Sequence, residues 1–333
     1  MKATRTAPQP PSFDRRTLIA AAGGLLLAPL ARAQTPGWPA KPIRLVIPYG
    51  TGGATDSLGR LLAAKMVDAL GQPVVVENRP GANGAIGTAE LARAPADGYT
   101  FCLISSSHVV NPFVNKEVGY NVRTDFQAVT MLTRLSSVLV VHPSVPARNV
   151  RELVALIKQN PDKYFYGIAG GLSNGHVMME RFKHEAGLSV TPVMYKGAGP
   201  AALELVAGRI QLMIVAPPGV KGFIDTGKLN VLASTGVRNP VGFTSLPNMV
   251  DEGYPQLEGY EWLGLITRAG TPRAIVDRVN AVIATALKDP AIVRTLNGQS
   301  QEIVADSADN FGQFINRELD RYAVLVKTLD LKE

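Results

Sequence analysis

The sequence predicts an α/β protein built from two domains. Short runs rich in Val and Ile alternate with stretches whose apolar residues recur at helical spacing, from residue 43 to the end of the chain. This alternation is typical of α/β architectures with mainly parallel sheets. Pro143 and Pro146 follow one of the strand-like runs and mark the expected crossing into a second domain. The 333 residues, 46% of them apolar, suffice to bury a large core and exclude a disordered chain.

The predicted elements follow in order along the chain. In the first part, strands are expected at 43–48, 74–77 and 99–104. One helix is expected to include Leu58 to Leu70 and to stop at Gly71, and a second helix to end at Ala94. In the second part, strands at 138–142, 165–169, 190–195, 210–215 and 231–234 alternate with helices that begin after Asn149 and at 177 and 200. A strand at 260–267, a helix from 271 and a last helix at 309–329 close the chain. We expect residues 34–137 and 260–333 to form domain 1 and residues 138–259 to form domain 2.

The first 33 residues have the organisation of an export signal. Two arginines at 15 and 16 precede a 13-residue apolar run, 18–30, and Ala-Arg-Ala ends at Ala33. A helix of that length spans about 20 Å, too short for a bilayer core of about 30 Å. The arginine pair resembles the twin-arginine export signal, from which Asp14 and Leu18 depart. We expect cleavage near Ala33.

Charge and cysteine content exclude several classes of function. Without residues 1–33, the formal charge of +7 falls to +3, with 29 basic and 26 acidic residues scattered along the chain. So small a charge gives no footprint for nucleic acid. Cys102 is the single cysteine, which excludes an intramolecular disulfide and a Cys-rich metal site, and four histidines leave little material for a His-based one. We expect no metal, no cofactor and no nucleic-acid partner.

Three glycine-rich loops, at 50–56, 170–176 and 196–200, each follow a strand and open a helix. Free N–H groups and the positive end of the helix dipole favour an anion at such a place. In open α/β sheets, ligands collect beyond the carboxyl ends of the strands. Two or three of these loops facing one cleft would clamp a small carboxylate; the alternative is that all three are ordinary tight turns.

The run 171–175 fits the G-x-S-x-G nucleophile elbow, with Ser173 as the nucleophile. That motif needs a histidine later in the chain, and only His176 and His184 follow Ser173. The favoured role of Ser173 is therefore a hydrogen bond to a ligand or a helix cap. A secreted serine ester hydrolase using Ser173 is the alternative function.

Several individual side chains in or beside these loops are compatible with a ligand-binding role and with a structural role. Asp56, in a first helical turn, suits the helix dipole, and it can also orient loop N–H groups or bind an ammonium or a hydroxyl group. His108 and His176 can reach an anion or serve as caps or structural residues. Tyr49 and Tyr195 are equally compatible with a cleft wall and with the core.

Six motifs in order carry a family resemblance: 47–56 (Ile-Pro-Tyr-x-x-Gly-Gly-x-x-Asp), 76–84 (Val-Glu-Asn-Arg-Pro-Gly-Ala-Asn-Gly), 96–100 (Ala-Asp-Gly-Tyr-Thr), 195–201 (Tyr-Lys-Gly-x-x-Pro-Ala), 227–229 (Gly-Lys-Leu) and 269–272 (Ala-Gly-Thr-Pro). Together they resemble the extracytoplasmic solute-binding proteins of tripartite tricarboxylate transporters, the Bug or TctC-type family. The resemblance covers the whole chain after residue 33.

The resemblance implies a type II periplasmic-binding-protein fold, in which two α/β domains close around one ligand. It further implies a monomeric, periplasmic, non-enzymatic protein. Its ligand would be a small organic carboxylate (a di- or tricarboxylate, an amino acid or an aromatic acid), delivered to membrane subunits of the transporter. The ligand-binding residues it implies are Tyr49, Gly52, Gly53, Asp56, Ser106, Ser107, His108, Gly171, Ser173, Asn174, His176, Tyr195, Lys196, Gly197 and Pro200.

Two segments depart from the family pattern. Residues 238–243, Arg-Asn-Pro-Val-Gly-Phe, depart modestly from a basic segment of the relatives, and we expect this to affect the outer surface rather than the ligand. The other departure concerns the pocket. Residues 211–218, Gln-Leu-Met-Ile-Val-Ala-Pro-Pro, stand where relatives usually have an acidic residue and a more polar strand end. We expect this wall of the pocket to be apolar and the distal half of the ligand to be bulkier or less polar than citrate.

Overall fold

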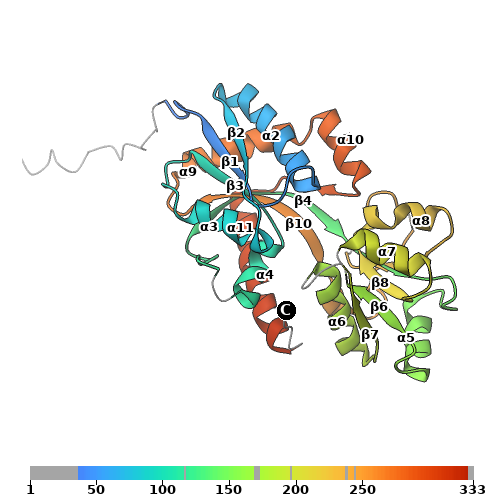
Figure 1. Cartoon of the computed structure of the whole chain (residues 1–333). Helices are drawn as coiled ribbons and strands as arrows, with labels where there is room; N and C mark the ends of the chain where they lie inside the picture. The colour runs from blue at the N-terminus through green and yellow to red at the C-terminus, as the bar shows by residue number, and fades with distance from the viewer. Residues whose placement is uncertain are drawn as a thin grey trace, which may run out of the picture. The chain divides into compact units, whose positions relative to one another are not determined.

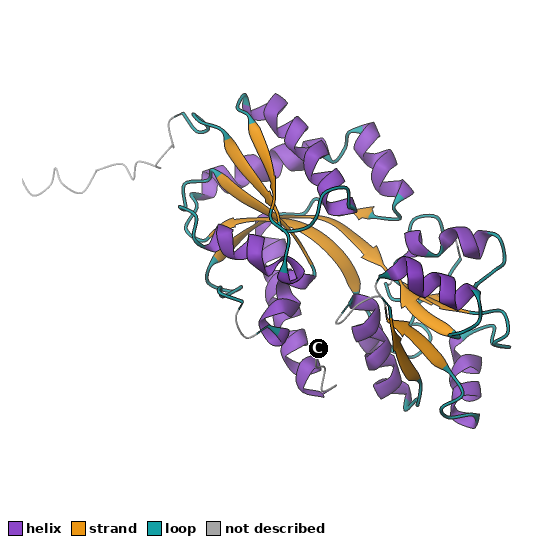
Figure 2. Cartoon of the chain, in the orientation of Figure 1, coloured by secondary structure: helices purple, strands orange, loops and turns teal. Residues whose placement is uncertain are grey.

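The computed structural model describes residues 37–115, 118–168, 173–195, 197–236, 239–243 and 245–328. The predicted export signal, Gly171 and Lys196 lie outside these residues. The described chain forms two β-sheets with helices packed on them, which confirms the α/β class (Figure 2). Among the described residues, no helix has the length and apolar character needed to cross a membrane.

The first sheet has six strands in the order β11-β4-β10-β3-β1-β2 (Figure 1). Their bounds are β1 (Ile43–Ile47), β2 (Val74–Asn78), β3 (Thr100–Ser105), β4 (Phe126–Ser136), β10 (Tyr260–Arg268) and β11 (Glu302–Ile303). β1 is parallel to β2 and β3, whereas β10 is antiparallel to β3 and β4.

Helices cover both faces of this sheet because its strands are apolar on both sides. Gly59 of helix α2 (Ala54–Leu70) packs so closely on Ile47 and Leu103 that a Cβ atom there would lie 2.5 Å from Ile47. The next residue along β3, Ile104, belongs to the cluster around Phe311 of helix α11 (Ala308–Thr328). Since successive strand residues point to opposite faces, α2 and α11 cover opposite sides. The remaining helices here are α3 (Ala85–Ala92), α4 (Ser107–Val114), α9 (Arg273–Ala286), α10 (Pro290–Gly298) and the 3₁₀ turn η1 (Ala82–Gly84).

The second sheet has five strands in the order β7-β6-β8-β5-β9. The strands are β5 (Val138–Val141), β6 (Phe165–Ile168), β7 (Thr191–Met194), β8 (Leu212–Val215) and β9 (Asn230–Ser234). Helices α5 (Val150–Gln159) and α6 (Asn174–Ala186) pack on one face through Leu153 and Phe182. Helix α7 (Ala198–Val206) packs on the other face through Leu205. Short helical segments complete this part: η2 (Pro217–Gly219), α8 (Lys221–Asp225) and η3 (Pro255–Leu257).

The expectation of mainly parallel sheets is wrong, because antiparallel pairs are as prominent as parallel ones. The chain runs from β4 directly into β5 of the second sheet and later returns to the first sheet as β10. A parallel neighbour requires a crossover connection that carries the chain back to the starting end of the sheet. β10 has no such crossover, since it enters from the side of the second sheet and so runs antiparallel to β3.

Local signals at helix ends are confirmed where the sequence is most explicit. Gly71 ends α2 in the left-handed conformation, with φ 72°, and its N–H donates to the carbonyl of Val67. The Asn149 side chain accepts a hydrogen bond from the N–H of Glu152 and so caps α5.

Candidate functional site

A cavity of about 430 Å³ lies where the loops that follow β1 and β3 approach η2 of the second sheet. We call it the loop cavity. Its lining residues are Gly52, Thr55, Ser57, Ser105, Ser106, Thr133, Leu135, Ala216, Pro218, Glu261, Trp262, Leu263, Gln299 and Gln301. The carboxyl ends of β1 and β3 therefore share a hollow with the end of β8, as expected for ligand sites in α/β proteins.

The first glycine loop is held in shape by the buried carboxylate of Asp56. Its Oδ2 accepts hydrogen bonds from the N–H of Gly52 at 3.0 Å and from Arg60 Nε at 3.1 Å. Asn78 Nδ2 donates to Oδ1 at 2.9 Å. The Arg60 hydrogen bond, followed by that from Gly52, lowers the pKa of Asp56 to about 2. Asp56 therefore orients the loop, one of the roles expected from the sequence.

Gly52 and Gly53 place this loop at the start of α2. Gly52 lines the loop cavity and has φ 84°, a conformation that favours glycine. Gly53 is the N-cap of α2 and, since it has no side chain, makes no side-chain capping hydrogen bond. The first-turn N–H groups of α2 therefore have no capping side chain among the described residues and are available to a ligand. The carboxylate of Asp56, in the same turn, offsets part of the positive charge of this helix end.

Tyr49 joins the ends of β1 and β3 through hydroxyl groups. Its hydroxyl group lies 2.6 Å from Ser105 Oγ and 2.8 Å from Ser107 Oγ, and it accepts a hydrogen bond from the N–H of Ser105. Burial raises the pKa of Tyr49, so the phenol is neutral. Ser106, between the two bonded serines, lines the loop cavity. Tyr49 and Ser107 thus support the cavity wall that Ser105 and Ser106 form.

The structure places His108 in the core rather than at the cleft. Its side chain is 2% exposed, its ring stacks with Tyr120 at 5.8 Å, and it meets Phe126 edge-on at 5.1 Å. Neither ring nitrogen has a hydrogen-bond partner among the described residues. Burial lowers the pKa of His108 to about 3, which keeps the ring neutral. The expectation that His108 lines the cleft is corrected because the first turn of α4 directs its side chain inward among aromatic rings.

Next to the second sheet, Ser173 is the N-cap of helix α6. Its Oγ accepts a hydrogen bond from the N–H of His176 at 3.4 Å, which is the capping role considered from the sequence. Among the described residues, no hydrogen bond joins Ser173 Oγ to a histidine ring. Asn174 Nδ2 donates a hydrogen bond to Ser137 Oγ at 3.3 Å. Asn174 Oδ1 and His176 Nδ1 are buried, and neither has a hydrogen-bond partner among the described residues.

Tyr195, Gly197 and Pro200, the remaining expected residues that the structure describes, are not among those that line the loop cavity. Tyr195 packs against the cluster beneath α7, Gly197 is the N-cap of α7 with φ 118°, and Pro200 is exposed in the first turn. The start of α7 touches η2, since a Cβ atom at Gly219 would lie 3.9 Å from that of Ala198. Pro218 of η2 lines the cavity, so the start of α7 packs against an element of the cavity wall.

Sequence reasoning missed the wall contributed by β4, β10 and the α10–β11 segment. Thr133 donates its hydroxyl hydrogen to Gln301 Oε1 at 2.6 Å, and Gln301 donates to Gln299 Oε1 at 3.0 Å. Glu261 of β10 also lines the cavity and has no side-chain hydrogen bond or ion pair among the described residues. Burial raises the pKa of Glu261. No motif marks these residues, because they are far apart in the sequence and meet only in the folded chain.

The described residues contain no group of three or more His, Cys, Asp or Glu side chains able to hold a metal ion. Cys102 is buried, and burial raises the pKa of its thiol. The cavity therefore presents hydroxyl, amide, carboxyl and apolar groups, a set suited to reversible binding.

Comparison with known proteins defines the class of this one. The family model "Tripartite tricarboxylate transporter family receptor" matches residues 58–331. Protein BugT of Bordetella pertussis is 34% identical over 297 residues, which cover 89% of this chain and 91% of BugT. A protein of Pseudomonas sp. strain P51, encoded in the tcbD–tcbE intergenic region, is 30% identical and covers 95% of this chain and 94% of its own length. The chain belongs to the tripartite tricarboxylate transporter receptor family, as the resemblance indicated.

Solved structures agree with this assignment. A periplasmic transporter is 35% identical, with a TM-score of 0.73 over 89% of this chain and 99% of its own. R. palustris Rpa4515 with adipate is 32% identical, with the same TM-score and coverage. A TctC solute-binding protein from Polaromonas, without ligand, is 28% identical, with a TM-score of 0.79 over 88% of this chain and 100% of its own. The fold is that of the TctC-type periplasmic binding proteins, and the family consists of periplasmic solute receptors.

Proposed function

We propose that this receptor holds a small organic carboxylate in the loop cavity and passes it to the membrane subunits of a tripartite tricarboxylate transporter. One observation carries the proposal: the loop cavity opens at the uncapped start of α2, between Ser105 and Ser106 on one side and Pro218 on the other. A carboxylate there would accept hydrogen bonds from first-turn N–H groups and serine hydroxyl groups.

The helix start supplies a modest but directed attraction. An anion at a helix N-terminus is favoured by about 0.3–1 kcal/mol, and by up to ~2 kcal/mol when it is partly buried. Asp56 uses the N–H of Gly52, so the ligand would bind the N–H groups that follow it in the first turn. Adipate in Rpa4515, a relative at 32% identity, supports the carboxylate class.

The other walls favour a particular shape of ligand. Ala216, Pro218 and Leu135 are apolar and suit a methylene or aromatic body. Glu261 faces the same cavity and would repel a second carboxylate unless one of the two is protonated. We therefore favour a ligand with one carboxylate, an apolar middle and an ammonium, hydroxyl or amide group toward Glu261.

Binding would proceed by closure of two domains, residues 34–137 with 260–333 and residues 138–259. The first domain would contribute Gly52 and Ser106, and the second would contribute Ala216 and Pro218. A ligand that contacts both domains stabilises the arrangement for which it has the higher affinity.

Thermal unfolding with a panel of carboxylates tests this function. Adipate, malate, amino acids and aromatic acids are each titrated, because a ligand at 100 times its Kd stabilises the folded state by about 2.7 kcal/mol. At least one acid is expected to raise Tm without being converted. If none changes Tm, or if an ester is hydrolysed by the wild type and not by Ser173→Ala, the receptor proposal fails.

Site-directed variants locate the carboxylate. Gly53 has φ −77° and only Gly50 O, at 3.9 Å, near its missing Cβ, so Gly53→Val is compatible with the backbone. Its isopropyl group would cover the start of α2. Gly53→Val and Asp56→Ala should each weaken binding more than the control Ser173→Ala does. Wild-type affinity in both first-loop variants would remove this loop from the site.

A further inference from the structure

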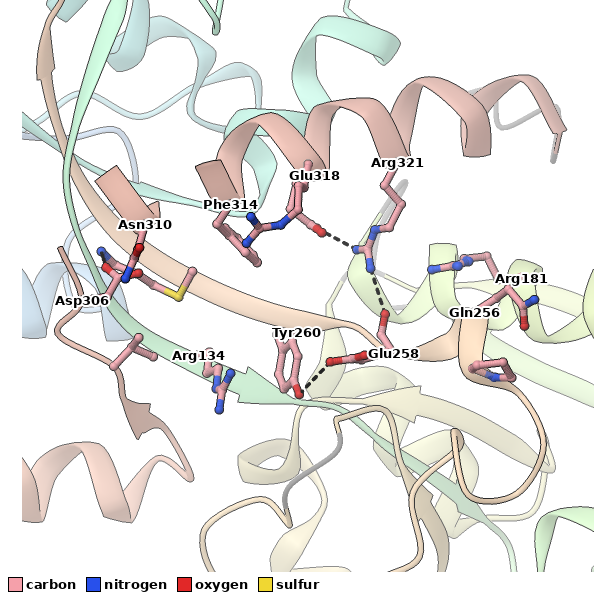
Figure 3. Close-up of a pocket in the computed structure, with 14 residues that line it drawn as sticks. Arg134, Arg181, Gln256, Glu258, Tyr260, Asp306, Asn310, Phe314, Glu318 and Arg321 are labelled. Carbon is pink, nitrogen blue, oxygen red and sulfur yellow. Dashed lines mark hydrogen bonds and ion pairs between the residues drawn. The ribbon is translucent and has the colours of Figure 1, made fainter. Parts of the chain in front are cut away.

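A second cavity, of about 700 Å³, lies on the other face of β4 and β10, and we call it the arginine cavity (Figure 3). Arg134 lines it, whereas the adjacent residues Thr133 and Leu135 line the loop cavity. Successive strand residues point to opposite faces, so the two cavities are separated by the strands themselves. No lining residue is common to both.

Arg181 of α6 is the unusual residue of the arginine cavity. Its side chain is buried, at 7% exposure, and it makes no side-chain hydrogen bond or ion pair among the described residues. Nη1 in particular is buried without a partner there. Burial, and then the nearby charge of Arg321, lowers the pKa of Arg181 to about 10, which still leaves it protonated at neutral pH. The nearby charges of Glu185 and Glu318 favour the protonated guanidinium, but neither carboxylate forms an ion pair with Arg181 among the described residues. A buried charge without a direct partner is unfavourable, so an anion in contact with Arg181 would stabilise it.

Arg134 and Arg321 also line the cavity and are paired with carboxylates, whereas Arg317 is exposed. Arg134 forms two hydrogen bonds with Glu302, at 2.8 and 2.9 Å. Arg321 donates to Glu318 Oε2 at 2.7 Å and to the carbonyl of Glu258 at 2.8 Å. Its Nε is nevertheless buried without a partner in the described chain. Figure 3 shows the guanidinium groups of Arg181 and Arg321 turned toward each other across the cavity. Arg181 and Arg321 therefore line the same cavity, and each carries one buried N–H donor that has no acceptor among the described residues.

We propose that Arg181 and Arg321 bind a small oxyanion, a carboxylate or a phosphate, at a second site separate from the loop cavity. Guanidinium groups bind both kinds of oxyanion through paired N–H donors. The site would also be a link within the fold. α6 is anchored in the core of the second sheet through Phe182, and α11 is anchored in that of the first through Phe311. A bound oxyanion would therefore hold α6 and α11 together.

The test uses the full mature chain, with phosphate, sulfate and acetate compared against chloride at equal ionic strength. We expect an oxyanion to raise the Tm of the wild type above its value in chloride. Arg181→Met should abolish that difference and should itself raise Tm in chloride, because it removes an unpaired buried charge. Arg181→Lys keeps the charge but lacks the paired donors, and it should weaken oxyanion binding about tenfold in titration calorimetry. Comparison of the phosphate and acetate arms identifies the preferred oxyanion.

Two controls separate this site from the loop cavity. Arg294→Met removes a solvent-exposed arginine of α10 and should respond to the oxyanions as the wild type does. Gly53→Val, designed to block the loop cavity, should retain the oxyanion effect, whereas Arg181→Met should retain the response to whichever carboxylate the panel identifies. An equal oxyanion response in the wild type and in Arg181→Met, or its loss in Gly53→Val, overturns the second site.

Discussion

The carboxylate of Asp56 accepts a hydrogen bond from the backbone N–H of Gly52, four residues earlier, at 3.0 Å. The N–H of Gly52, which the sequence led us to expect free for the ligand, is therefore already bound to a buried acidic side chain. The same carboxylate binds Arg60 and Asn78, which ties the loop to α2 and to the end of β2. The loop is shaped before any ligand arrives, so its binding groups are already oriented.

Replacing Asp56 by Asn should weaken both the fold and the site. Loss of hydrogen bonds to a buried charged group costs roughly 1–3 kcal/mol, and the loop loses its anchor. Because the folded-state pKa is lowered from 3.8 to about 2, the stability from ionised Asp56 is complete above about pH 4 and is lost as pH falls through about 2. Acid unfolding curves should show that loss in the wild type and not in Asp56→Asn. Asp68→Asn, an exposed change on the same helix, is the matched control.

Replacing Glu261 by Gln should stabilise the protein at neutral pH. Burial raises the pKa of Glu261, so the folded state binds the proton more tightly than the unfolded chain does. Stability is then lost in the wild type as pH rises from the ordinary pKa of 4.5 through the raised value. The gain in Glu261→Gln, roughly 1–3 kcal/mol at pH 7, should vanish below about pH 4 in urea unfolding.

The same substitution tests the polarity of the loop cavity. A dicarboxylate should bind the wild type more tightly at low pH, and Glu261→Gln should make its affinity less dependent on pH. An amino acid whose ammonium group faces Glu261 should instead bind the variant more weakly. Glu185→Gln, at an exposed position of α6, should change neither affinity. Identical pH profiles for Glu261→Gln and the wild type would show that Glu261 does not face the ligand.

Tyr49→Phe should reduce stability and affinity together. The substitution leaves the N–H of Ser105 without its acceptor and breaks the contacts to two serine hydroxyl groups. An unsatisfied buried group costs about 1–3 kcal/mol. Tyr164→Phe is a suitable comparison, since Tyr164 is buried and its hydroxyl has no hydrogen bond among the described residues. Calorimetric titration that finds equal affinity for both variants would contradict a supporting role of Tyr49.

His108→Leu should flatten the acid side of the stability curve without affecting binding. Burial lowers the pKa of His108 from 6.5 to about 3, so the unfolded state takes up a proton that the folded state excludes. The wild type therefore loses up to ~1.4 kcal/mol per pH unit from this residue as pH falls from about 6.5 toward 3. Unfolding curves at pH 7, 5 and 4 measure the slope. A large loss of ligand affinity in His108→Leu would contradict this prediction and indicate that His108 contributes to ligand binding.

The strands and helices predicted from periodicity lie close to those found, because each of these predictions depends only on residues a few positions apart in the sequence. The end of α2 at Gly71 and the cap at Asn149 are of this kind. The strand β4 was not predicted, since Gln127, Thr130 and Thr133 interrupt its apolar residues. Their burial depends on β10 and β11, which come more than a hundred residues later.

The residues of the candidate site also fall into those that the sequence indicates and those that only the tertiary structure brings together. The glycine loop at Gly52 was recognisable because a strand, two glycines and a helix follow one another. The opposite wall, with Glu261 and Gln301, carries no such signal. Nor does the sequence indicate whether a polar residue such as His108 turns toward a cavity or into the core, because packing against Tyr120 and Phe126 decides it.

By itself the sequence determined the alternation of strands and helices, the family, and the loops whose backbone N–H groups begin a helix. The tertiary structure alone decided the antiparallel course of β10, the partners of Asp56, and the two separate cavities on opposite faces of β4 and β10. The physical reason is range: helix periodicity and capping depend on neighbours within a turn, whereas strand pairing and side-chain burial depend on contacts between residues far apart in the chain.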